Sequence, residues 1–579
     1  MNDRRPLFAI ALIMMIALIP SFLLKKPAPK APAAAVVAPA GTADSSTAPG
    51  LVPTDSAAPV LRAVPPGADS TVAVTPAVAE DTVVVRSSLY RYAISTHGGR
   101  LISSRFLNYK SMALGDTLAN GKLDTLELLP VGTSLLAAKL AIGGDTLRLD
   151  QVAYTASVDS LTPMDGNEVV TLTGQSGAYG ITLAYHFAPD DFKIHVNGTI
   201  TGLGAGGGTL LVGLGNGFRD SEKNLVEDHR ERAIVTKQDG TKLTRLMSLV
   251  PRQPTTMSGP FEWVAVKSKY FVIGAFAYDS TGPKSFTGRI GGLRALATDA
   301  TPEKPVRADV AASLSVPASG HYAVTFYIGP MEYDRLNHMG HDFDDVNPYG
   351  WAWLRPVIRP IAVALRDLFI WMHHALGLGY GLVIVAFGIM IRLVLWPLNQ
   401  KAMRSMTAMQ AIQPQLTEIQ TKYKEDPARL QQEMFKLYKE NNVNPFGGCW
   451  PMLLPYPMLV AVFFVLQNTI ELRGVSFLWM PDLAQFDPLY IIPVLMASSM
   501  FAVSKIGMMG MPPNPQTKMM SWMMPLMMLV FFSKFASGLN LYYAVQNMVS
   551  LPQQWMIMKE RRKVMEARNA PVVVGTKRR

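Results

Sequence analysis

The sequence predicts an α-helical polytopic membrane protein that carries one large all-β domain outside the bilayer. Three observations lead to this fold class. One apolar stretch follows the amino terminus, five more crowd together beyond residue 375, and a long region of short alternating runs lies between them. With 579 residues, of which 49% are hydrophobic, the chain exceeds one ordinary domain and is apolar enough to lie partly in a membrane.

Residues 1–24 are expected to form a signal-anchor span. Their apolar part, PLFAIALIMMIALIPSFLL, is about the minimum length for a span, and the arginines before it favour a cytoplasmic amino end. A cleaved signal peptide is the alternative, although lysines stand between the span and the small residues that follow. Residues 25–80, rich in Ala, Pro, Thr and Ser, are expected to be an extended linker.

Residues 81–345 form the predicted β domain. Apolar and polar residues alternate in runs such as DTVVVRSSLYRYAIST, GITLAYHFA, FKIHVNGTI and HYAVTFYIG, with Gly, Asp and Asn turns between them. The region is long enough for a core of its own, and no run in it could cross a bilayer. We therefore expect a β sandwich on the outer side of the membrane, which is the periplasm in a cell with two membranes.

Residues 346–375 are expected to form an amphipathic helix lying on the bilayer, since WAWLRPVIRPIAVALRDLFIWMHH mixes tryptophan, arginine and aliphatic residues at helical spacing. A core of five spans follows at 376–558. With the first span this makes six crossings, so the basic tail, 559–579, returns to the cytoplasm. The expected spans of the core are 376–398, 449–470, 489–504, 519–532 and 539–558.

A cytoplasmic helical hairpin is expected at 399–448, between the first two spans of the core. Apolar and glutamine residues recur three or four apart, and the run breaks at Asp426-Pro427, where Pro427 suits the first turn of a second helix. The apolar seam is narrow, which favours a mobile hairpin over a rigid bundle.

Arg392 is the main candidate functional residue, because it lies in the span GLVIVAFGIMIRLVLWPL and no predicted span contains an acidic residue. A charge at membrane depth costs roughly 2.5–3.5 kcal/mol on insertion scales. The side chain either snorkels to the headgroups or lies in a wet cavity between spans, where it attracts acidic residues of a passing polypeptide. Polar residues of other spans that suit such a cavity, or that simply bond helix to helix, are Gln467, Asn468, Ser498, Ser499, Tyr542, Tyr543, Gln546 and Asn547.

The sequence gives no support for an enzyme, a cofactor or a metal site. The single cysteine, Cys449, excludes intramolecular disulfides and cysteine-based metal centres. We find no Ser/His/Asp order, Walker loop, dinucleotide fingerprint or HExxH motif. The net charge of +11 fits contacts with ribosomes or anionic lipids and implies no specific nucleic-acid readout.

The chain resembles the YidC/Oxa1/Alb3 family of membrane protein insertases, in the six-span form of Gram-negative bacteria. The resemblance covers nearly the whole length. It is strongest over the segment from IRLVLWPLNQKAMRSM to NNVNPFGGCWPMLLPYPM, over FLWMPDLAQFDPLYIIPVLM and over SGLNLYYAVQN, and weaker over ISTHGGRLISSRFLNY and YIGPMEYDRL of the outer domain.

This resemblance implies a β-supersandwich outer domain and a five-span core that encloses a hydrophilic groove. The groove arginine is Arg392, and Tyr542 and Tyr543 match positions that contact substrate; the client's apolar span leaves along the third and fifth spans. The implied function is to insert and help fold nascent inner-membrane proteins, alone or with the Sec translocon (SecYEG, SecDF). The implied partners are nascent chains, that translocon, the ribosome and anionic lipids. Substrate-groove candidates are Arg392, Gln467, Asn468, Tyr542, Tyr543, Gln546 and Asn547.

Two departures from the family pattern and two rival functions remain. Relatives often carry a polar residue one turn before the arginine, where this chain has Gly388, and Pro455 and Pro457 interrupt the third span. A solute transporter with a periplasmic sensing domain is the alternative function, although the spans show no paired repeats. The second rival function is that of a carbohydrate-binding module anchored to the membrane by the rest of the chain.

Overall fold

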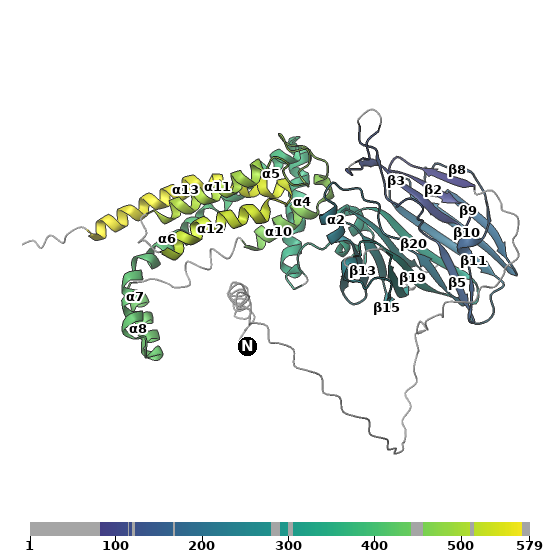
Figure 1. The fold of residues 1–579 in the computed structure, drawn as a ribbon, viewed down its shortest axis with the longest axis horizontal. Coiled ribbons are helices and arrows are strands. Elements are labelled where there is room, and N and C mark those ends of the chain that lie inside the picture. The colour runs from purple at the N-terminus through teal and green to yellow at the C-terminus, as the bar shows by residue number, and fades with distance from the viewer. Residues whose placement is uncertain are drawn as a thin grey trace, which may run out of the picture. The chain divides into compact units, whose positions relative to one another are not determined.

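The computed structural model describes residues 81–569, except 114, 119–121, 166–167, 279–289, 299–304, 352, 442–455 and 510–514. The predicted anchor, 1–24, and linker, 25–80, lie outside the described residues, as do the start of the third predicted span and the end of the basic tail. Within the described part, strands dominate as far as Pro330 and helices follow (Figure 1).

Three sheets build the β domain, which confirms the predicted sandwich (Figure 1). Their strand orders are β4-β3-β2-β1-β8, β14-β13-β16-β17-β20-β11-β10-β9-β7 and β15-β18-β19-β12-β5-β6. The strands are β1 (Thr82–Arg86), β2 (Tyr90–Ser95), β3 (Arg100–Lys110), β4 (Thr125–Glu127), β5 (Ala138–Ile142), β6 (Asp145–Leu147), β7 (Tyr154–Ala156), β8 (Ser160–Leu161), β9 (Val169–Ser176), β10 (Tyr179–Phe187), β11 (Lys193–Thr201), β12 (Gly208–Gly213), β13 (Ala233–Lys237), β14 (Thr241–Arg245), β15 (Pro254–Phe261), β16 (Trp263–Lys267), β17 (Phe271–Tyr278), β18 (Ile290–Ala297), β19 (Ala308–Val316) and β20 (His321–Pro330).

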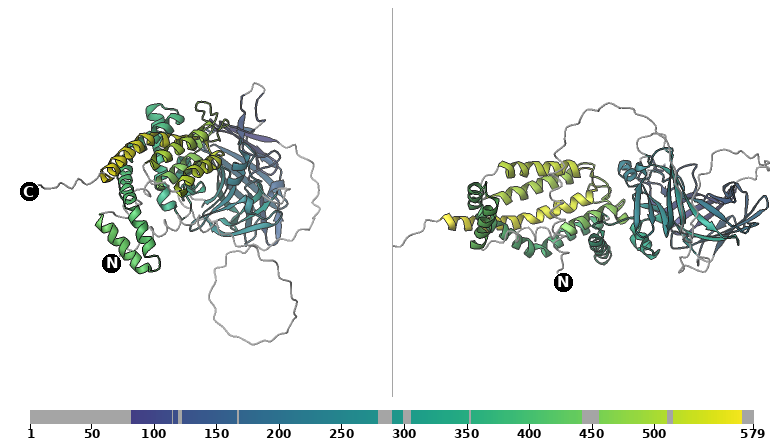
Figure 2. Two further views of the ribbon diagram at one scale, coloured as in Figure 1. Left: turned by 60° about the vertical axis from the view of Figure 1, so that its left-hand side comes forward. Right: turned by 90° about the horizontal axis from the view of Figure 1, so that it is seen from below.

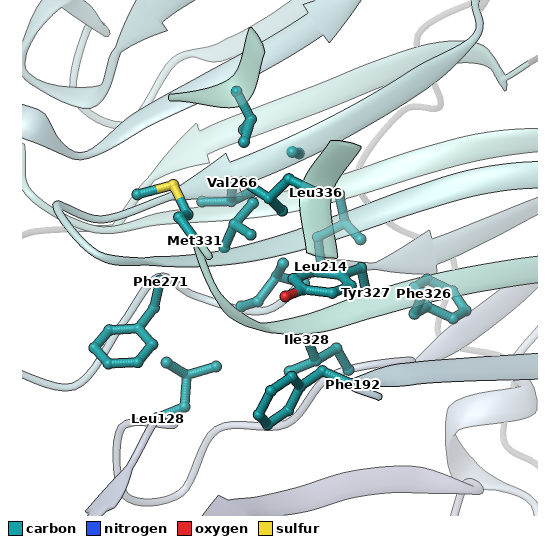
Figure 3. Close-up of a cluster of buried hydrophobic side chains, with 14 of the residues drawn as sticks. Leu128, Phe192, Leu214, Val266, Phe271, Phe326, Tyr327, Ile328, Met331 and Leu336 are labelled. Carbon is teal, nitrogen blue, oxygen red and sulfur yellow. The ribbon is translucent and has the colours of Figure 1, made fainter. Parts of the chain in front are cut away.

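Side chains from different sheets meet in the core of the β domain. Phe106 of β3 packs edge-on against Phe192, just before β11, with 5.2 Å between ring centroids. Tyr92 of β2 donates a hydrogen bond to the carbonyl of Ile328 in β20 at 3.0 Å. Alternation in β10 sends Ile181, Leu183 and other apolar side chains to this core. Figure 3 shows part of it, formed by Leu128, Phe192, Leu214, Val266, Phe271, Phe326, Tyr327, Ile328, Met331 and Leu336.

The helices after β20 follow the order that the sequence predicts, with some shifted ends. Gly377, with φ of 62°, ends α4 in the left-handed conformation that glycine adopts most readily, so α5 begins four residues later than the predicted span. The described helices are α2 (Leu225–Glu231), α3 (Tyr333–His338), α4 (Arg355–Leu376), α5 (Tyr380–Val394), α6 (Trp396–Ala411), α7 (Gln413–Lys422), α8 (Pro427–Glu440), α10 (Tyr456–Asn468), α11 (Ile491–Met508), α12 (Pro515–Phe532) and α13 (Ser537–Asn569).

The predicted hairpin consists of three helices. The Asp426 carboxylate accepts a hydrogen bond from the backbone N–H of Arg429, which caps α8 where the break is predicted. The first helical run is divided between α6 and α7, because Pro414 lies in the first turn of α7 and cannot donate a helical hydrogen bond. Ile412 and Leu437 form a small buried seam between α6–α7 and α8, as narrow as expected.

Helix length and composition do not by themselves confirm six spans. Among the described residues, α11 alone is long and apolar enough to cross a membrane, and α4 with α5 would add a second if this pair, bent by 116°, were one span. Helix α10 has only 13 described residues, and α13, with 33 residues, includes many charged and polar ones in its second half. The five helices α5, α10, α11, α12 and α13 nevertheless occupy the positions of the five predicted core spans.

Two helices of this core, α5 and α13, run in the same direction. Along α5 and α13, Phe387 stacks on Tyr542 and Arg392 bonds to Gln553, so both helices advance in the same direction. The Met496 carbonyl of α11 accepts a hydrogen bond from Asn547 of α13. Helix α11 packs against both α12 and α13, and Figures 1 and 2 show these helices lying side by side.

Ion pairs made by two buried arginine side chains join the β domain to the helical region. Arg473, after α10, donates to Glu222 of the β domain at 2.8 Å, and both side chains are at most 3% exposed. Arg366 of α4 pairs with Asp334 of α3 at 2.8 Å and with Glu471 at 3.1 Å. Each cation therefore has a carboxylate from another segment, which offsets the cost of burying its charge.

We expect Arg473→Leu to destabilise this junction, because it leaves the Glu222 carboxylate buried without its cation. Breaking a buried ion pair costs roughly 3–5 kcal/mol. Burial raises the pKa of Glu222 to about 7 from 4.5. Glu222 therefore contributes most to the stability of the fold below its ordinary pKa of 4.5, and this contribution is lost as pH rises through its folded-state pKa of about 7. Denaturant titration in detergent at about pH 5 and about pH 8 should show the larger loss at the higher pH.

The double variant Glu222→Leu/Arg473→Leu is the control for this prediction. It removes both charges and should recover much of the lost free energy of unfolding, because two apolar side chains need no partner. Equal losses at both pH values, or a double variant no more stable than the single one, would exclude the ion pair as the source of the effect.

Candidate functional site

Arg392 lies in the last turn of α5 and is half-buried. Its Nη2 donates a hydrogen bond to Oε1 of Gln553 in α13 at 2.9 Å. Its Nε is buried and has no hydrogen-bond partner among the described residues. No carboxylate in the described part of the chain forms an ion pair with Arg392. The guanidinium thus contacts a neutral amide and keeps its net charge.

Close packing of α13 against α5 creates this arrangement. A Cβ atom at Gly388 would lie 3.0 Å from Cγ1 of Val545, so a larger residue would require Val545 to shift. The Gly388 carbonyl also accepts a hydrogen bond from Nε2 of Gln546 at 2.8 Å. An amide from the neighbouring helix therefore lies one turn before Arg392, where Gly388 itself offers no polar side chain.

The two tyrosines lie on different sides of α13. Tyr542 is buried and stacks on Phe387 of α5, with 5.9 Å between ring centroids. Tyr543 is half-buried and packs edge-on against Phe532 at the end of α12, at 5.6 Å. Asn547 is directed to α11, where its Nδ2 donates to the Met496 carbonyl at 3.4 Å. Tyr542 and Gln546 therefore share the α5 face with the arginine, whereas Tyr543 and Asn547 face other helices.

Gln467 and Asn468 lie elsewhere, at the carboxyl end of α10. The Asn468 carbonyl accepts a hydrogen bond from Asn347, and Gln467 is buried with its Nε2 unpartnered among the described residues. Phe463 of α10 packs against Phe535, just before α13 begins. Gln553 lies sixteen residues further along α13, roughly 24 Å by helix rise. The structure therefore does not bring the seven predicted groove residues into one cluster.

Gln553 is a residue that the sequence analysis missed. It is 1% exposed, and besides accepting from Arg392 it donates from Nε2 to the Trp396 carbonyl at 3.1 Å. A signal was present in the spacing, because Tyr542, Gln546 and Gln553 are four and seven residues apart and so share one helical face.

One cluster in the β domain has potential metal ligands, namely Asp220, Asp228 and His229, whose ligand atoms lie within 4.8 Å of one another. The buried Arg232 guanidinium already fills this site. It donates to Asp220 at 2.6 Å and to Asp228 at 2.8 Å. The cluster is therefore a satisfied ion-pair network and offers no cation site.

Comparisons with known proteins cover both parts of the chain. A family model described as the YidC periplasmic domain matches residues 82–362, and one described as 60Kd inner membrane protein matches residues 371–564. A solved structure of an active YidC insertase, with its first transmembrane domain resolved, is 17% identical and covers 82% of this chain and 94% of its own, with a TM-score of 0.31.

The family of this chain is shown by its similarity to known relatives. The membrane protein insertase YidC of Chlorobaculum tepidum is 32% identical over 505 residues, which cover 82% of this chain and 81% of the relative. That of Chlorobium luteolum is 32% identical over 527 residues, or 86% of each chain. With matches of this extent across both parts, the chain belongs to the YidC family of membrane protein insertases and functions as an insertase of the inner membrane.

Proposed function

We propose that this insertase admits the outer tail of a nascent membrane protein into a polar groove beside α5 and α13, where Arg392 attracts acidic residues of the client. One observation carries the proposal: Arg392 is half-buried, its Nη2 contacts the neutral amide of Gln553, and its Nε has no partner among the described residues. No carboxylate among the described residues neutralises this charge, and an acidic side chain of the client would do so.

The physical benefit of a groove follows from solvation. A polar tail that crosses about 30 Å of hydrocarbon would leave its charges and backbone groups without hydrogen bonds. A groove that reaches part of this depth shortens the dry path. A cation within the groove lowers the cost of an acidic tail, and the client's apolar span gains free energy when it reaches lipid.

The proposed topology has six spans, with both termini in the cytoplasm and the β domain, 81–345, in the periplasm. The shared direction of α5 and α13 supports it, since two parallel spans require an even number of crossings from one to the other. We assign 376–558 to the insertase core, 399–448 to the cytoplasmic hairpin and 559–579 to the cytoplasmic tail. Helix α13 continues to Asn569, so this tail begins as a helix.

We assign 346–375, which includes α4, to the membrane surface. One face of α4 is packed inward through residues such as Ile358, Leu365 and Phe369, whereas Trp371 is 58% exposed. Exposed tryptophan beside arginine suits the headgroup region and anionic lipids.

The route of the client's apolar span is proposed to follow α10 and α12. The described side chains of α12 include many exposed apolar ones, which suit either lipid or a varied apolar segment. They are Met519, Met520, Trp522, Met523, Leu526, Met527, Val530 and Phe531. The hairpin and the basic tail are proposed to receive nascent chains from the ribosome, and the Sec translocon to share clients with this core.

Arg392→Ala should impair insertion of small single-span clients with acidic outer tails, whereas Arg392→Lys should retain much of it. Losing one charge-assisted hydrogen bond costs roughly 1.5–3 kcal/mol, which predicts about a tenfold or larger loss. The measurement is protease protection of the translocated tail in liposomes that contain only the purified chain. Equal protection by the alanine variant and the parent chain would remove Arg392 from the mechanism.

Deleting residues 81–333 should leave most of this insertion activity, because the groove is formed by helices of the core. The cut also spares Asp334 and Asp345, the partners of Arg366 and Arg355 in α4. The deletion variant is compared with the full chain in the same liposome measurement. Complete loss of insertion by a folded, monodisperse deletion variant would instead place an essential function in the β domain.

A further inference from the structure

Both the oxygen and the nitrogen of the Gln553 side-chain amide form hydrogen bonds at the junction between α5 and α6. Its Oε1 accepts from Nη2 of Arg392 at 2.9 Å, and its Nε2 donates to the carbonyl of Trp396 at 3.1 Å. Trp396 is the first residue of α6 and follows Arg392 by four positions. At 1% exposure, Gln553 therefore holds both ends of the segment 392–396 from inside the helix packing.

The chemistry of an amide suits this position in a way that neither an acidic nor an apolar side chain does. A glutamate would pair with the guanidinium and neutralise it, and when ionised it could not donate to the Trp396 carbonyl. An apolar side chain would leave both the guanidinium and that carbonyl without this partner. A neutral acceptor orients Arg392 without reducing its charge.

The arginines at the junction with the β domain provide the contrast. The side chains of Arg366 and Arg473 are each at most 3% exposed, and each is paired with at least one carboxylate. Their charges are neutralised in place, as structural arginines require. Arg392 alone among these three contacts an amide, which leaves its charge free for another partner.

We propose that Gln553 is a positioning residue for the insertion reaction, which fixes the Arg392 guanidinium while keeping its full positive charge available to an acidic client side chain. This inference rests on the proposed role of Arg392. It extends that role, because Gln553 is the residue that keeps Arg392 both oriented and unneutralised, and these two properties would make the arginine selective for acidic tails.

The test compares two forms of one single-span client in liposomes, one with its acidic outer tail and one in which the tail carboxylates are changed to amides. Gln553→Glu should reduce insertion of the acidic form about tenfold, as a lost charged hydrogen bond predicts, and should leave the neutral form near the parent level. Gln553→Met leaves the charge of Arg392 unneutralised but removes the oxygen that orients its guanidinium. This variant should lower insertion of the acidic form by less than Gln553→Glu does and should likewise spare the neutral form.

Gln554→Glu is the matched control. It places the same charge one residue further along α13, on a half-buried side chain turned about 100° around the helix axis from Gln553. It should insert both client forms like the parent. In the Arg392→Ala background, Gln553→Glu should cause a smaller selective loss than in the parent chain, because the charge that it would neutralise is absent.

The outcomes separate the two claims. If Arg392→Ala discriminates against the acidic client and neither Gln553 variant does, Gln553 is not the positioning residue and the proposed groove stands. If both Gln553 variants reduce acidic and neutral clients equally, the residue only supports packing and the inference fails. If Arg392→Ala shows no selectivity, the proposed groove fails and this inference fails with it.

Discussion

The contact between α5 and α13 is the interaction on which the proposed groove depends. Gly388 lets Val545 approach so closely that an added Cβ would lie 3.0 Å from it. This approach places Gln546 against the Gly388 carbonyl and Gln553 against Arg392. A larger side chain at position 388 would therefore force Val545 to shift and would disturb the close contact beside these two hydrogen bonds.

Arginine side chains in the described chain have two different environments. At the junction with the β domain, Arg366 and Arg473 meet carboxylates, so their burial adds connections between segments without leaving net charge. At the end of α5, Arg392 meets the amide of Gln553. Burial strengthens the field of an unneutralised cation, because less water surrounds it. The second environment therefore suits capture of a charged client better than it suits stability.

The sequence predicted the β sandwich and the order of the helices because their signals are local. Alternation marks the strands, apolar runs mark the core helices and Asp426-Pro427 marks the start of α8. The site was harder, because it depends on which helices meet. Gln467 and Asn468 lie in an apolar run like the other candidates, yet α10 carries them to its far end. Gln553 was missed because the sequence shows that it shares a helical face with Tyr542 and Gln546 but not that this face packs against Arg392.

Helix α13 connects the proposed groove to the segments proposed to be cytoplasmic by one continuous helix. It carries Tyr542, Gln546 and Gln553 and then extends to Glu560, which pairs with Arg404 of α6 at 3.1 Å. That ion pair is exposed, so salt screens it and it fixes α6 only weakly. The buried contacts of α13 with α5 are shielded from such screening. These buried contacts would keep the arginine site ordered if the hairpin α6–α8 moved, as its proposed role of receiving nascent chains would require.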